Sequence, residues 1–233
     1  MSLVEILVAV AIVAILLVLA LPLSKSLNQA RYDTQCISNL RQLSVAAQSY
    51  IADNNGILRS MEGGNDISWM WTRMLLLGGY LNPDVHGGTD NDRLLRQIDS
   101  VGSLLRCPKG EVGPAYSREF PARWIWQTYG MGMFDPEFEI RPALATKYTG
   151  IYEAPLSRIS KPSSYILFAD SATTQSNLQQ SFRISRTAGS GGVALRHNKR
   201  AHVVFLDGHT ESVDRERLEE LKVPNFNIFD VKQ

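Results

Sequence analysis

The feature that most constrains this chain is an unbroken apolar run near its N-terminus, which follows a single carboxylate. Residues Ile6 to Leu21 are all apolar, and Glu5 is the only charged residue before Lys25. A helix over residues 1–23 would be about 34 Å long, enough to span a hydrocarbon core of about 30 Å. Glu5 therefore needs an explanation, because an ionised side chain at the centre of a bilayer costs roughly 3 kcal/mol on insertion scales.

Three interpretations of this segment compete. A secretory signal peptide normally begins with Lys or Arg and ends in a small-residue cleavage site, and this run has neither. A plain membrane anchor explains the apolar run but gives Glu5 no role, although the cost of its charge is smaller near a helix end. In the third interpretation Glu5 pairs with the free α-amino group of an identical helix, so that its partner belongs to another subunit.

The residues after Pro22 turn polar but keep a helical rhythm. Apolar residues recur at spacings of three and four and predict one buried stripe: Cys36, Ile37, Leu40, Leu43, Ala47, Tyr50 and Ile51. The sequence "DNNG" at residues 53–56 predicts the helix end. We therefore expect a long helix over residues 1–53, with an apolar part (1–23), an amphipathic part (24–53) and a bend or local break at Pro22.

Residues 54–233 are expected to form a globular head with both helices and strands. The patterns predict a short helix within 67–81, a buried strand at 165–169 and a last helix at 214–221. Asp207-Gly208 lies between two apolar-rich runs, which is a strong signal for a β-hairpin.

The N-terminal residues "MSLVEILVAVAIVAILLVLALPLSKS" resemble the mature start of a type IV pilin or pseudopilin. In that family a prepilin peptidase removes a short basic leader, and no Lys or Arg precedes the apolar run here, so we expect a leader to have been trimmed already. Met1 stands where the family commonly has Phe. The resemblance implies that Met1 is a processed, N-methylated terminus and that Met1, Glu5 and Pro22 serve assembly.

A second resemblance lies near the C-terminus. His197 is followed by nine residues and then Asp207-Gly208, which is similar to the H-x9-DG signature of a bacterial pilin-like family. Four further segments resemble that family in the same order: "CISNLRQLSVAAQSYIADNNG", "RCPKG", "TYGMGM" and "PSSYILFADS". The resemblance implies a pilin-like α+β fold, in which a long N-terminal α-helix packs on a mostly antiparallel β-sheet head.

The same resemblance implies a structural function rather than catalysis. The chain would polymerise into an extracellular type IV pilus-like filament, with copies of itself, the prepilin peptidase and the assembly machinery as partners. It would reside in the inner membrane before assembly and at the cell surface afterwards. The alternatives are a pseudopilin of a type II secretion or uptake system, and a membrane-anchored extracellular binding domain that does not polymerise.

His197, Asp207 and Gly208 are expected to build a turn rather than a reactive site. In this hypothesis Asp207-Gly208 makes the turn and His197 fixes the neighbouring loop by a hydrogen bond. The alternative is a cation site with Asp170, His202 and His209 as further candidates, but nothing in the sequence shows convergence, so we predict no metal and no cofactor. No catalytic triad spacing, nucleophile elbow or P-loop occurs, so we predict that the protein is not an enzyme.

The two cysteines, Cys36 and Cys107, are predicted to form a disulfide, because a head beyond the cytoplasm meets an oxidising environment. The bridge would close a loop of about 70 residues and contribute on the order of 4 kcal/mol by chain entropy. Two buried free thiols are the alternative.

Charge gives little guidance on partners, since 24 basic residues face 23 acidic ones. A basic segment (183–200) precedes an acidic one (211–220). The default interpretation is a solvated surface, and the alternative is that these patches meet on neighbouring heads. We expect no nucleic acid partner, because Phe182, directly before the basic segment, is the one aromatic residue that could interleave with its charges and stack on bases.

Overall fold

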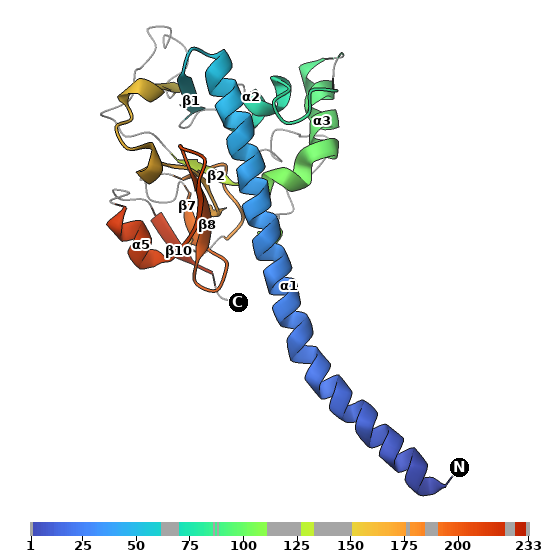
Figure 1. Cartoon of the computed structure of the whole chain (residues 1–233). Helices are drawn as coiled ribbons and strands as arrows, with labels where there is room; N and C mark the ends of the chain where they lie inside the picture. The colour runs from blue at the N-terminus through green and yellow to red at the C-terminus, as the bar shows by residue number, and fades with distance from the viewer. Residues whose placement is uncertain are drawn as a thin grey trace.

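The structure is a computed structural model, and its longest element is a helix that begins in the apolar run (Figure 1). It describes residues 2–61, 70–85, 87, 89–110, 127–132, 151–175, 178–184, 191–221 and 227–231. Helix α1 (Leu3–Asp53) passes through Pro22 without a break, and its N-terminal part extends away from the head (Figure 1). Of the two alternatives predicted at Pro22, the local break is therefore not found, and α1 curves between the head and its N-terminus (Figure 1).

Both ends of α1 are formed by residues suited to them. At the start, the Ser2 side chain accepts a hydrogen bond from the backbone of Glu5. At the end, Asn55 and Gly56 adopt left-handed conformations with φ of 57° and 74°, which Asn and Gly tolerate best. The helix stop predicted at residues 53–56 is thus confirmed.

The second part of α1 supplies one wall of the hydrophobic core. Of the predicted stripe, all residues are buried except Ile37, which is half-buried. These side chains pack with strands β4 (Ile166–Ala169) and β8 (Ala201–Phe205) and with the helical region of the head. The helical region consists of α2 (Trp71–Leu77), α3 (Asp90–Val101) and the 3-10 turn η2 (Gly102–Leu105).

The described strands form three separate sheets. The two-stranded sheet pairs β1 (Ile57–Met61) with β3 (Ile151–Pro155) in antiparallel fashion. The five-stranded sheet has the order β6 (Arg183–Ile184), β2 (Gly130–Gly132), β4, β8, β9 (Thr210–Val213). The three-stranded sheet has the order β10 (Asn227–Asp230), β7 (Gly192–Leu195), β5 (Ser171–Ala172).

Several local predictions for the head are confirmed. The strand predicted at 165–169 is β4, and β8 and β9 form the antiparallel hairpin predicted around Asp207-Gly208. The last helix is α5 (Arg215–Glu220), and the short helix predicted within 67–81 is α2, which ends before Gly78. Two short 3-10 turns, η3 (Leu156–Arg158) and η4 (Pro162–Ser164), lead into β4.

The predicted fold, a pilin-like one in which a long N-terminal α-helix packs on a mostly antiparallel β-sheet head, is wrong, although the chain does combine helices and strands as an α+β class requires. The structure describes the side chains of α1 without interruption only as far as Leu16. Within the described residues, no helix combines the length and the apolar character that a membrane span needs. The head divides into three sheets, and two strand pairs, β2 with β6 and β7 with β10, are parallel. Strands β4 and β5 belong to different sheets, and Asp170 is the single residue between them. The chain therefore passes from one sheet to another at Asp170.

Candidate functional site

The start of α1 exposes an apolar surface. From Leu3 to Leu16 the large aliphatic side chains are all more than half exposed, between 51% at Ile6 and 77% at Leu3. Contiguous exposed apolar surface of this kind is rare on soluble monomers and marks contact with a protein or a membrane. We name this segment, residues 3–16, the apolar tip.

Glu5 has a partner within its own chain. The Ser2 backbone N–H donates to Glu5 Oε2 at 2.8 Å, and the Glu5 backbone N–H donates to Ser2 Oγ at 3.3 Å. These reciprocal bonds form a capping box, and its sequence signal, Ser followed three residues later by Glu, is readable at positions 2–5. The assembly role predicted for Glu5 rests on the pilin resemblance and is separate from this capping role. Met1 lies outside the described residues, and the Pro22 side chain is likewise not described.

The two cysteines are brought together from distant parts of the chain. Cys36 lies on α1 and Cys107 follows η2, and both are buried. Their Sγ atoms lie 2.7 Å apart as two free thiols. The predicted disulfide remains a prediction.

The two halves of the H-x9-DG signature occupy different environments. His197 is buried just after β7, whereas Asp207 is exposed in the turn between β8 and β9. Asp207 Oδ1 accepts from the backbone N–H of His209 at 3.1 Å and pairs with its ring at 2.5 Å. Gly208 has a φ of 91°, a left-handed conformation that glycine adopts readily. Asp207 and Gly208 thus make the turn as predicted, and neither is in the cluster around His197.

The His197 side chain joins α1 to the head. Its Nδ1 bonds to Asp33 Oδ1 on α1, and its Nε2 lies 3.3 Å from Asp170 Oδ2 and 3.3 Å from Cys107 Sγ. The local turn is held by the backbone instead, because the backbone N–H of His197 donates to the carbonyl of Arg200 at 2.8 Å and the reverse bond is 3.0 Å long. The hydrogen bonds between His197 and its neighbouring loop are thus backbone bonds, and the side chain bonds to other segments.

Burial and the neighbouring groups shift the pKa values of His197 and Asp170 in opposite directions. Burial lowers the pKa of His197, but its hydrogen bonds to Asp170 and Cys107 outweigh burial and raise that pKa to about 10. Burial raises the pKa of Asp170, yet the hydrogen bond from His197 and the charges of both nearby histidines lower it overall. Burial raises the pKa of the Cys107 thiol well above its usual range. Charge separation between His197 and Asp170 is thus favoured, and the thiol stays protonated.

His202 completes the surroundings of His197. The two rings lie 4.1 Å apart between centroids, and His202 Nε2 is 3.7 Å from Asp33 Oδ1. The His202 backbone N–H donates to Asp170 Oδ2 at 2.8 Å. Burial lowers the pKa of the His202 side chain.

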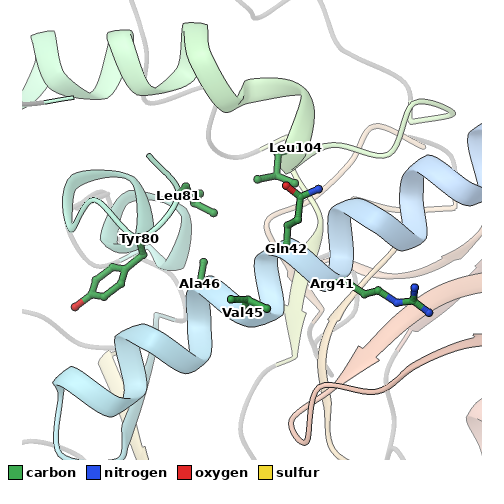
Figure 2. A pocket seen from close by; sticks show the side chains of 7 residues that line it. All are labelled: Arg41, Gln42, Val45, Ala46, Tyr80, Leu81 and Leu104. Atoms are coloured by element: carbon green, nitrogen blue, oxygen red, sulfur yellow. The ribbon is translucent and has the colours of Figure 1, made fainter. Parts of the chain in front are cut away.

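A surface hollow lies between α1 and the helical region of the head (Figure 2). Figure 2 shows Gln42, Val45 and Ala46 on α1 facing the region of Leu81 and Leu104. Arg41 and Tyr80 also line it. The hollow contains no group of converging titratable side chains, so it offers no chemistry comparable to that of the buried cluster.

No family model, curated protein or solved structure matches this chain. Two features of the chain itself bear on its function: the apolar tip and the buried cluster around His197. Within this cluster Cys36, Cys107, Asp170 and His197 are each at most 3% exposed.

Proposed function

We propose that this protein is a structural subunit that polymerises into an extracellular type IV pilus-like filament through the apolar tip of α1. The observation that carries the proposal is the exposure of every large aliphatic side chain in the tip. Burial of one such side chain contributes about 1.5–3 kcal/mol, so contact between tips of several copies would be strongly favoured in water. The resemblance to pilin N-termini gives the class of assembly.

The geometry of α1 suits repeated addition of copies. The tip extends away from the head (Figure 1), so helices from different copies can lie side by side without contact between the tip and its own head. Addition of one copy to the next through unlike surfaces yields a fibre when the rotation between copies does not close a ring. Before assembly we place the same apolar surface in the inner membrane, and afterwards inside the filament.

Glu5 would have two functions in this assembly. In the single chain its Oε2 caps the first turn of α1. A carboxylate has two oxygens and several lone pairs, so it can also accept from the Met1 amine of an adjoining subunit. A carboxylate buried in the filament without such a partner would disfavour misregistered addition.

The two functions of Glu5 can be separated by substitution. Glu5→Gln keeps a side chain that can form a capping box but removes the negative charge. Ser2→Ala removes the cap and keeps the charge. We expect Glu5→Gln to abolish or disorder filaments and Ser2→Ala to leave them abundant, when sheared cell surfaces are examined by electron microscopy.

The outcomes discriminate between the alternatives. Abundant normal filaments from Glu5→Gln would show that capping is the only role of Glu5. Short or scarce assemblies of the wild-type chain would favour a pseudopilin of a secretion or uptake system. A wild-type chain that stays single in the membrane would contradict polymerisation and favour an anchored binding domain.

A further inference from the structure

We propose that the head holds one structural zinc ion that ties α1 to the sheets, with four ligands: Cys36, Cys107, Asp170 and His197. Each of these side chains offers one ligand atom, and the four atoms lie within 4.8 Å of one another. The sequence predicted no metal site, because these residues are spread over more than 160 positions of the chain and lack any recognisable metal-ligand spacing. The inference is independent of the proposed filament.

The ligand set is one that zinc prefers. Two thiolate sulfurs, one imidazole nitrogen and one carboxylate oxygen can complete a tetrahedral site without an open position, which is typical of structural zinc. In such a site neighbouring ligand atoms lie roughly 3.3–3.8 Å apart. His197 Nε2 already lies 3.3 Å from both Cys107 Sγ and Asp170 Oδ2. The two sulfurs, at 2.7 Å, must separate by about 1 Å to bind the same ion.

Asp33 supplies the support that metal-bound histidines usually have. Its carboxylate bonds to His197 Nδ1, and a carboxylate at one ring nitrogen fixes the tautomer that presents the other nitrogen to a metal. Asp33 precedes Cys36 by three residues on α1, which places both side chains on one face of the helix. The same face of α1 therefore provides a direct ligand and the partner of a second ligand.

Asp170 gives an independent indication of a cation. Its side chain is fully buried, and within the described part of the chain its Oδ1 atom has no hydrogen-bond partner. A buried carboxylate with an unsatisfied oxygen is costly. A divalent ion bound to this carboxylate would offset the cost of burying it, whereas a disulfide would not.

The zinc site and the predicted disulfide exclude each other, because zinc binds thiolates and a bridge leaves none. The convergence of His197 and Asp170 on the sulfurs distinguishes the two states, since a disulfide requires neither side chain. The ligands follow or lie in four different elements, α1, η2, β4 and β7. One ion would thus join segments that are far apart in the sequence.

The first test uses the full chain, purified in detergent without reductant or chelator. We expect one zinc per chain by elemental analysis, and two thiols that alkylate after unfolding in the presence of chelator. Replacement of zinc by cobalt should give the sulfur-to-metal charge-transfer and visible bands of a tetrahedral cobalt thiolate site. Bridged cysteines without zinc would overturn the proposal, and so would two free thiols in a chain that binds no added zinc.

The second test uses a variant that leaves all four ligands in place. Asp33→Asn should weaken zinc binding about 10- to 100-fold in a chelator competition, with the thiol count unchanged. Asp53→Asn is the matched control, because Asp53 lies on the same helix but bonds to the hydroxyl of Tyr80. Equal zinc affinity in Asp33→Asn and wild type would contradict the arrangement around His197.

Discussion

The two parts of α1 differ in where their apolar side chains lie. In the apolar tip they surround the helix and are exposed, whereas in residues 36–51 all but the exposed Val45 form one stripe that the head covers. Polar residues interrupt the second part at intervals that leave one face apolar, whereas Glu5 is the one polar residue within residues 3–16. One continuous helix thus contains two different segments. The head covers the apolar face of the second segment, and it leaves the apolar surface of the first segment exposed.

The largest expected effect tests this division directly. Leu43 is fully buried in the head core, so Leu43→Ala should lower the free energy of unfolding by about 2–5 kcal/mol. Val8 is 53% exposed in the tip, and Val8→Ala should change that free energy by less than about 0.5 kcal/mol. Urea unfolding of both full-length variants in detergent measures the difference, and equal losses would refute the division of α1.

A smaller effect is expected from a polar residue on the covered face. Asn39 Nδ2 donates to the carbonyl oxygens of Ser103 at 3.0 Å and Arg106 at 3.1 Å. Asn39→Ala leaves both carbonyls without this donor and should destabilise the head by about 1–3 kcal/mol. Gln42→Ala is the control, because Gln42 is exposed and bonds within the helix to Ser38. If both variants unfold at the same urea concentration, these contacts do not stabilise the head.

A still smaller and local effect is expected at the tip. Ser2→Ala removes the cap of α1 and should destabilise its first turn by about 1 kcal/mol. Because the tip does not contact the head, the urea midpoint of the head should stay unchanged. Amide hydrogen exchange should quicken in the first turn alone, and a shift of the head midpoint would show that the two parts are coupled.

The smallest expected effect depends on pH and lies in the head. The backbone N–H of Arg217 donates to Asp214 Oδ1 at 3.0 Å, and this bond, with the nearby Arg200, lowers the pKa of Asp214 below 3.8. The stabilisation is therefore fully present above pH 3.8 and is lost as the pH falls through the lower pKa of the folded state. Asp214→Asn retains a capping side chain and should make amide exchange in α5 less sensitive to acid. If amide exchange in α5 responds to acid equally in Asp214→Asn and wild type, Asp214 is not the group that causes this response.

Local sequence patterns were sufficient to predict some elements of the head but not others. The turn at Asp207-Gly208 was predictable because it depends on neighbouring residues alone. Helix α3 was missed although its start carries a readable signal, since Thr89 and Asp92 form a capping box. The parallel pairing of β7 with β10 joins residues more than 30 positions apart, and no short-range periodicity specifies such a partner.

The amino-acid sequence by itself determined the apolar run, the stripe of the second half of α1, the helix stop at residues 53–56 and the last hairpin. Each follows from contacts between residues that are near one another in the chain, so spacing and residue type are enough. Only the tertiary structure decided the division into three sheets and the meeting of Cys36, Cys107, Asp170 and His197. Those features depend on how distant segments pack, and packing brings together side chains whose positions in the sequence share no period.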